Sequence, residues 1–214
     1  MNLNDLAGKL ERTDHATVSR ARPHLLKYAC VLTLDPNTAG KELSLSEGNR
    51  KVTFVREQQL YPEHPERFDW WRPQVLCREG LTGRCYWEAE WSDRGDMWNG
   101  SRGARITVAY KSIKRKGGGD DVIMGWNAKS WSLDCYPDRY SVWHNNKHTD
   151  IPAPSSRSRT VGVYLDWPAG TLSFYSVSTN TLTHLHTFHS TFTEPLYPGF
   201  GLWTDSSVSL CQIT

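Results

Sequence analysis

The stretch Arg84-Cys-Tyr-Trp-Glu-Ala-Glu-Trp91 decides the fold class, because apolar and polar residues alternate along it. Its apolar positions are Cys85, Trp87, Ala89 and Trp91, and the positions between them are Arg84, Tyr86, Glu88 and Glu90. Successive side chains of a β-strand point to opposite faces. The stretch therefore predicts a strand with one face in a hydrophobic core and the other face in water.

Runs with the same period continue along most of the chain. Residues 161–165 alternate, and Leu172 and Phe174 resume the pattern after Pro168-Ala-Gly170, which predicts a hairpin. About a dozen such short runs are separated by Gly, Pro, Asn and Asp, with no long helical pattern between them. An all-β antiparallel sandwich or barrel is therefore expected.

Residues 1–28 follow a different pattern. Leu3, Leu6 and Leu10 recur at helical spacing, and a polar stretch comes after them. We expect a short N-terminal helix and a tether there, followed by one compact domain over residues 29–214.

The composition narrows the function classes. The chain carries 25 basic and 23 acidic side chains, a net charge of +2, which argues against nucleic acid or a membrane surface as partner. No apolar run approaches the roughly 20 residues of a membrane span, and the N-terminal residues do not resemble a signal peptide. Five cysteines without a CxxC pair indicate neither a disulfide framework nor a zinc site. We therefore expect reduced thiols in a cytoplasmic protein, unless the chain is part of a larger secreted protein.

Signatures of catalysis are lacking, since the sequence has no GxSxG, HExxH, kinase or dinucleotide-binding motif. Glu88 and Glu90 share one face of a strand and could mimic a glycosidase carboxylate pair, but the block that contains them resembles a motif of a known domain family, which implies a structural or hydrogen-bonding role. His184 and His186, expected on one face of a strand, supply too few ligands for zinc. No enzymatic activity, cofactor or metal is therefore expected.

A basic segment, Lys111–Lys116, precedes three glycines at 117–119. A phosphate-binding P-loop has glycines before its lysine and a helix after it, so the order here does not match. A solvated hairpin tip is expected, with a basic loop that faces a partner as the alternative.

Five sequence blocks, in order, resemble those of the PRY-SPRY (B30.2-type) domain family. They are Leu32-Thr-Leu-Asp-Pro-Asn-Thr-Ala39, Tyr86-Trp-Glu-Ala-Glu-Trp91, Lys129-Ser-Trp-Ser-Leu133, Leu165-Asp-Trp-Pro-Ala-Gly-Thr-Leu-Ser-Phe-Tyr175 and Leu196-Tyr-Pro-Gly-Phe200. The resemblance places a PRY segment at 29–84 and a SPRY segment at 85–214. Within the family, residues 46–52 and 142–147 look like the fish modules that end tripartite-motif ubiquitin ligases, NOD-like receptors and stonefish toxins.

The resemblance implies a bent two-sheet antiparallel β-sandwich, a concanavalin-like jelly roll, with a binding surface made by loops at one end. It implies a non-catalytic module that binds a protein or peptide epitope, as the C-terminal targeting part of an innate-immune or ubiquitin-ligase protein. No RING or B-box zinc pattern precedes the domain, so ligase activity would come from elsewhere. The sequence leaves the oligomeric state open.

Two alternatives stay open beside this hypothesis. The chain could be the C-terminal module of a pore-forming toxin subunit. It could instead bind a small anionic phosphate ligand, if Arg102, Arg105, His144 and Lys147 converge.

Aromatic residues divide into two groups by their surroundings. Trp87, Trp91, Trp131 and Trp167 lie in apolar strand patterns and are expected in the core. Others lie in or beside the loops expected at 56–73, 92–103, 112–121, 140–158 and 197–205, where exposed aromatics are typical of binding hot spots. The resemblance favours Trp143, and the predicted partner-binding set is Trp143, Tyr140, His144, Asn145, Asn146, Trp98, Trp71 and Trp203.

Overall fold

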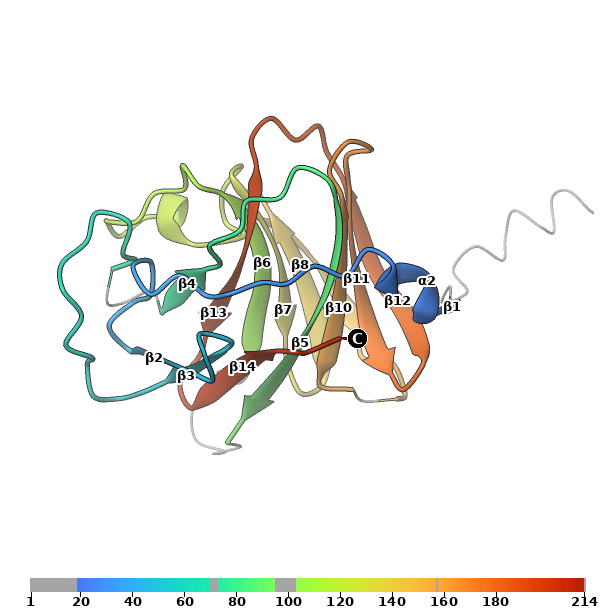
Figure 1. Cartoon of the computed structure of the whole chain (residues 1–214), viewed down its shortest axis with the longest axis horizontal. Coiled ribbons are helices and arrows are strands. Elements are labelled where there is room, and N and C mark those ends of the chain that lie inside the picture. Colours follow the sequence, from blue (N-terminus) through green and yellow to red (C-terminus); the bar gives the residue numbers. More distant parts are fainter. Residues whose placement is uncertain (1–18, 70–72, 95–102, 157, 214) are drawn as a thin grey trace, which may run out of the picture.

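Two antiparallel sheets face each other in the computed structural model, which describes residues 19–69, 73–94, 103–156 and 158–213 (Figure 1). The eight-stranded sheet has the order β1 (Ser19–Ala21), β12 (Thr181–His189), β11 (Thr171–Ser178), β10 (Thr160–Asp166), β5 (Arg84–Asp93), β14 (Ser206–Leu210), β3 (Lys51–Phe54) and β2 (Leu43–Ser46). The six-stranded sheet has the order β4 (Gln74–Leu76), β13 (Leu196–Leu202), β6 (Ala104–Tyr110), β7 (Ser130–Cys135), β8 (Arg139–His144) and β9 (Lys147–Pro152). The predicted two-sheet antiparallel sandwich is confirmed.

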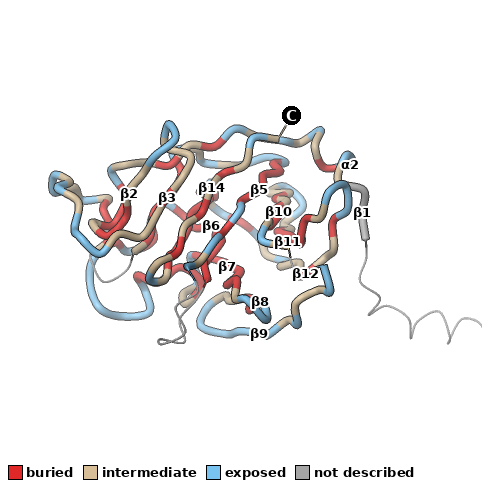
Figure 2. Tube along the Cα trace, turned by 90° about the horizontal axis from the view of Figure 1, so that it is seen from below, coloured by how far each residue is buried: buried red, intermediate tan, exposed pale blue. Residues whose placement is uncertain are grey.

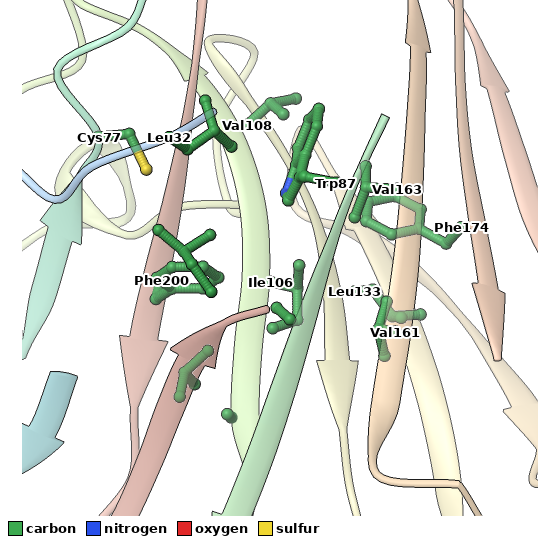
Figure 3. Packing of buried hydrophobic residues seen from close by; sticks show 14 of the residues in the cluster. Leu32, Cys77, Trp87, Ile106, Val108, Leu133, Val161, Val163, Phe174 and Phe200 are labelled. Atoms are coloured by element: carbon green, nitrogen blue, oxygen red, sulfur yellow. The ribbon is translucent and has the colours of Figure 1, made fainter. Parts of the chain in front are cut away.

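The core fills the space between the two sheets. Figure 3 shows side chains from both sheets, among them Phe200, Ile106 and Trp87, packed between the ribbons. Trp91 and Trp131 are also buried, each 2% exposed, so the prediction that these strand tryptophans fill the core is confirmed. Trp167 is only half-buried at the margin of the core, where its indole Nε1 donates to the carbonyl of Glu194 at 2.9 Å.

The outer face of β5 is only partly in water: Arg84 and Glu90 are exposed as predicted, whereas Tyr86 and Glu88 are covered. Tyr86 and Glu88 point outward and are nonetheless 0% and 3% exposed. The short helix α2 (Pro23–Leu26) and the chain around it cover this face, and Arg22 Nη2 donates to Glu88 Oε2 at 2.8 Å. The Tyr86 hydroxyl donates to the other carboxylate oxygen at 2.7 Å, and burial raises the pKa of Tyr86. Glu88 therefore has a structural role.

The end of the expected N-terminal tether is part of the sandwich. Strand β1 pairs with β12, and Leu25 of α2 is buried against Tyr175, Val177 and Leu182 on the outer face of the eight-stranded sheet. The helix expected around Leu3 to Leu10 lies outside the described residues. No helix within the described part of the chain is long and apolar enough to cross a membrane.

The predicted hairpin at 161–174 is confirmed as β10 and β11, with Gly170 at a φ of +72° in its turn. The expected loop at 140–158 is wrong for most of its length, because it holds the hairpin of β8 and β9. Asn145 and Asn146 form its turn, with φ of 51° and 60°, a conformation that asparagine tolerates. Strand β9 is an exposed edge strand with mostly polar residues (Figure 2). Because its residues do not alternate between apolar and polar, the sequence pattern does not predict a strand there.

A disulfide joins Cys30 to Cys85, which corrects the expectation of reduced thiols for these two cysteines. A parallel bridge between Ala29 and Tyr86 brings the two chain segments together, and the Cα atoms of the cysteines are 5.6 Å apart. This separation is within the usual range for a disulfide. The two cysteines are 55 residues apart, so no local sequence motif indicates that they are bonded. The remaining cysteines are free: Cys77, Cys135 and Cys211.

Replacing Cys30 with serine should lower the free energy of unfolding. The bond closes a 55-residue loop, for which the chain-entropy argument gives a stabilisation of about 4 kcal/mol. Chemical denaturation of Cys30→Ser against wild type measures the loss, and a reductant should lower the stability of wild type but not that of Cys30→Ser. Cys211→Ser, which removes a half-buried free thiol, is the control and should respond to the reductant like wild type. Equal stability of wild type with and without reductant would contradict the prediction.

Candidate functional site

A cavity of about 630 Å³ opens on the outer face of the six-stranded sheet. Its floor is a row of cross-strand neighbours from β4, β13, β6 and β7, namely Gln74, Gly201, Arg105 and Asp134. The residues that follow or precede them in each strand, such as Ile106 and Leu133, belong to the core. Because side chains alternate along a strand, the register that builds the core also turns this row outward.

A buried ion pair lies in the floor. Arg105 Nε and Nη2 donate to the two carboxylate oxygens of Asp134, each at 2.7 Å, and the two side chains are 10% and 1% exposed. Burial alone would lower the pKa of Arg105, but the charge of Asp134 and its hydrogen bonds outweigh this effect and raise it. The guanidinium carbon is 5.3 Å from the ring centroid of Trp203 and 6.0 Å from that of Trp126. The pair thus holds the centre of the floor in one orientation.

Half-buried aromatic rings form the walls. Trp126 and Trp143 stack with their centroids 5.4 Å apart, and His148 stacks on Trp143 at 4.3 Å. Tyr136 and Trp203 are in contact at 5.6 Å. Burial, reinforced by the nearby Asp134 charge, raises the pKa of Tyr136 to about 12, so its hydroxyl stays protonated at neutral pH.

The loop that carries Trp126 is clamped to the sheet by Gln74. The Gln74 amide donates to the carbonyl of Val122 at 2.7 Å and accepts from the backbone N–H of Met124 at 2.8 Å. Gly125 adopts a φ of +97°, and a Cβ there would lie 2.3 Å from the Ser132 hydroxyl oxygen. Only glycine fits this close approach, and the next residue, Trp126, is thereby directed to the cavity.

The remaining wall comes from the edge of the eight-stranded sheet. Glu42 immediately precedes β2, Phe54 ends β3, and both line the cavity with Ile123, Leu202 and Thr204. The N–H of Val55 donates to the carbonyl of Glu42 at 2.8 Å, which fixes the two segments together. The site therefore combines residues of both sheets.

Two of the predicted partner-binding residues, Trp143 and Trp203, line the cavity. Trp71 and Trp98 lie outside the described residues. Tyr140 is 3% exposed within the core, and its hydroxyl donates to the carbonyl of Ser158 at 3.3 Å. Burial raises the pKa of Tyr140 to about 12. Tyr140 therefore offers no surface to a partner.

His144 and the two asparagines also lie away from the cavity. The His144 ring stacks on Trp131 at 4.5 Å, and its Nδ1 is 2.8 Å from the carbonyl oxygen of Ser130. Burial lowers the pKa of His144. Asn145 and Asn146 are exposed, and the Asn146 amide donates to Asp120 Oδ2 at 3.1 Å. Their turn therefore docks on the loop that carries Trp126.

Sequence reasoning missed several cavity residues: Glu42, Phe54, Gln74, Trp126, Asp134 and Tyr136. A usable signal lies in β6 and β7, where Arg105 and Asp134 occupy outward positions of otherwise apolar or small strands. A charge at such a position on a central strand needs a partner on the neighbouring strand. The floor of the cavity is a sheet face, and loops contribute only to its walls. The predicted binding surface, made by loops alone, therefore differs from the observed cavity.

The alternative anion site is not assembled by the described residues. The charge of Arg105 is neutralised by Asp134, His144 faces the interior, and Lys147 is an exposed residue at the start of β9. Arg102 lies outside the described residues. Arg105, His144 and Lys147, the described residues of the predicted anion site, therefore do not form a basic pocket together.

The basic segment 111–116 makes contacts within the domain. Lys111, Lys114 and Lys116 pair with Glu66, Asp121 and Asp69. Arg115 is 8% exposed and donates to the carbonyls of Glu66, Lys111 and Ile113. These contacts attach the segment to Glu66 and Asp69 in the loop before β4. One of its four basic side chains, Arg115, is buried.

His184 and His186 do not share a face, contrary to the prediction. A β-bulge lies between their partners, so His184 is opposite Tyr175 on the outer face and His186 is opposite Phe174 on the core face. Among the described residues, no group of three or more His, Cys, Asp or Glu could hold a metal ion.

Asp134→Asn should destabilise the domain strongly, because it leaves the Arg105 charge buried without a counter-charge. Loss of one partner of a buried ion pair costs about 3–5 kcal/mol. Denaturant unfolding measures the change, with Asp121→Asn as the control. Asp121 forms an exposed pair with Lys114, so its replacement should cost less than about 1 kcal/mol. A loss below about 1 kcal/mol for Asp134→Asn would contradict the prediction.

The stability of the domain should fall as the pH drops from about 7. Burial lowers the pKa of His144 in the folded state, so below the ordinary value near 6.5 the unfolded state binds more protons. The loss ends once the pH is below the folded pKa. Unfolding of His144→Phe at several pH values should show a shallower decline than wild type. Equal slopes for wild type and His144→Phe would rule out this role.

Comparisons with known proteins agree with the fold and its sequence blocks. Residues 32–81 match the PRY, or SPRY-associated, domain, and residues 84–212 match the SPRY domain. Stonustoxin subunit beta from Synanceia horrida is 46% identical over 181 residues, which cover 84% of this chain and 24% of that protein. Tripartite motif-containing protein 16 from Mus musculus is 37% identical over 185 residues, which cover 86% of this chain and 31% of that protein.

Solved structures of similar proteins share the architecture. A stonustoxin structure superposes with a TM-score of 0.79 at 42% identity, covering 89% of this chain and 28% of that chain. The crystal structure of the TRIM65 PSpry domain gives a TM-score of 0.77 at 30% identity, covering 90% and 96%. The chain thus spans 24% to 31% of the length of the two curated relatives above. The resemblance predicted from the five sequence blocks is confirmed, and the chain belongs to the PRY-SPRY domain family.

Proposed function

We propose that this domain recognises a protein or peptide through the cavity on its six-stranded sheet and performs no chemistry there. The observation that carries the proposal is the set of half-buried rings of Trp126, Trp143 and Trp203 around a fixed floor. Tryptophan is enriched among binding hot spots, because a large rigid ring buries much surface when a partner covers it. An aromatic pocket of this kind suits one or two anchoring side chains of a partner.

The rigidity of the cavity supports this role. The floor belongs to paired strands, the loop of Trp126 is clamped by Gln74, and Trp143 is stacked on both sides. A partner would therefore lose little free energy to ordering of this surface on binding. Preorganisation favours specific recognition by few residues.

The polar groups of the cavity do not form a catalytic pair. The functional groups of Arg105 and Asp134 are bound to each other, and Glu42 has no second acid or base beside it among the described lining residues. Acid–base or nucleophilic catalysis needs such a partner within hydrogen-bond reach. A binding module fits the site better than an enzyme.

The domain would act as the targeting part of a longer protein. Relatives of the tripartite-motif type favour a cytoplasmic innate-immune or ubiquitin-ligase protein, in which the domain selects the target. A toxin subunit is the second candidate. The 46% identity to stonustoxin subunit beta favours it, and so does the Cys30–Cys85 disulfide, because disulfides persist in oxidising compartments. The region encoded before this domain decides between them, since a RING region favours the first and a pore-forming region the second.

Trp143→Ala tests the proposed recognition role. Peptides selected from a displayed random library on the wild-type domain should bind the variant about 30-fold more weakly, which corresponds to about 2 kcal/mol for a hot-spot ring. Titration calorimetry measures the affinity, and thermal unfolding checks that the variant keeps its fold. Tyr164→Ala is the matched control, because this half-buried ring lies on the outer face of the other sheet. Unchanged binding by a folded Trp143→Ala variant would refute the assignment of the site.

A further inference from the structure

Glu42 stands out among the charged groups of the cavity. Its side chain is buried, with 8% exposed, and its Oε2 atom has no hydrogen-bond partner. The other oxygen accepts a long hydrogen bond of 3.4 Å from the Gln58 amide. The neighbouring Lys41 is paired with Glu63 at 2.5 Å, and no ion pair of Glu42 is formed within the described residues. A buried carboxylate without a cation is energetically unfavourable, and burial accordingly raises the pKa of Glu42.

The charge balance of the cavity is consequently negative. Among the described residues, three charged side chains line it: Glu42, Arg105 and Asp134. Arg105 and Asp134 neutralise each other through their two hydrogen bonds. Glu42 therefore supplies the uncompensated charge among the described lining residues, and a partner of opposite sign would complement it.

The aromatic walls favour the same sign of ligand. The faces of tryptophan and tyrosine rings carry negative electrostatic potential and attract ammonium and guanidinium groups. The domain already uses this interaction beside the cavity, where the Arg139 guanidinium carbon lies 4.5 Å from the ring centroid of Tyr136. Within the cavity the Arg105 guanidinium carbon lies 6.0 Å and 5.3 Å from the ring centroids of Trp126 and Trp203, and these half-buried rings line the remaining space.

We propose that the cavity takes the cationic side chain of a partner protein, an arginine or a lysine, with the Glu42 carboxylate as its counter-charge and the tryptophan rings as its walls. This inference rests on the proposed recognition function and names the chemistry of the anchoring residue. An anionic or phosphate-bearing ligand would meet Glu42 unfavourably, which separates this inference from the phosphate alternative.

Small probes of matched shape test the sign of the charge. Acetyl-arginine amide, acetyl-lysine amide and acetyl-citrulline amide are titrated into the whole chain at constant ionic strength, and the tryptophan indole N–H resonances are followed by NMR. Citrulline keeps the planar end group of arginine without its charge. Saturable shifts should appear for the arginine or the lysine probe, with an affinity about tenfold higher than for citrulline. Equal affinities, stronger binding of inorganic phosphate, or no saturable shift up to about 100 mM would overturn the inference.

Glu42→Gln provides the matched variant, because it removes the charge and keeps the shape. The preference for the cationic probe over citrulline should disappear, while the thermal stability stays equal to or above that of wild type, since a desolvated charge is removed. Glu63→Gln removes the exposed carboxylate paired with Lys41 and should leave the preference intact. A retained preference in a folded Glu42→Gln variant would sink the assignment of Glu42.

The two proposals fail in different ways. If the recognition function is wrong, Trp143→Ala leaves peptide binding unchanged. If only the cationic anchor is wrong, Trp143→Ala still weakens the selected peptides, but replacing their arginine and lysine residues with citrulline or norleucine leaves the affinity unchanged.

Discussion

The alternation of side chains along each strand is the constraint that connects the core of this domain to its binding surface. In β6 and β7, Ile106 and Leu133 face the core, so Arg105 and Asp134 must face outward. A slip of one residue in either strand would bury one charge in the core and expose an apolar side chain. The packing that stabilises the sandwich thus also positions the floor of the cavity, and the domain needs no separate scaffold for its site.

Buried charges are handled in two different ways. Arg105 with Asp134 and Arg22 with Glu88 form hydrogen-bonded ion pairs, one on the outer face of each sheet. Such pairs contribute orientation more than net stability, because desolvation offsets much of their attraction. Glu42 departs from this rule, since it is buried at the cavity without a cation among the described residues. Two other buried charges, Arg67 and Arg115, donate to backbone carbonyls instead of an acid. The unpartnered Oε2 of Glu42 is therefore the strongest chemical indication of what a partner would supply.

The errors made from the sequence have specific physical causes. Tyr140 and His144 are in phase with the buried Val142, so alternation along this strand places them on the face opposite Trp143, and only Trp143 of the three lines the cavity. The hairpin there was missed because β9 is an exposed edge strand without an apolar face. The histidines of β12 were assigned to one face because a β-bulge shifts the register and leaves no mark in the residue pattern. The Cys30–Cys85 bond depends on contact between segments that are far apart in the chain.

The sequence by itself determined the class of fold, the family and the tryptophans of the core, because period-two alternation and the five sequence blocks are local properties of the chain. Trp143 and Trp203 could be named as candidates for the same reason, since their blocks and surroundings are local. Only the tertiary structure decided that Trp126, Arg105 and Glu42 meet in one cavity, and that Tyr86 and Glu88 on the outer face of β5 are buried. These features arise from strand order and from the contact of distant segments, and side-chain alternation carries no information about which strand lies next to which.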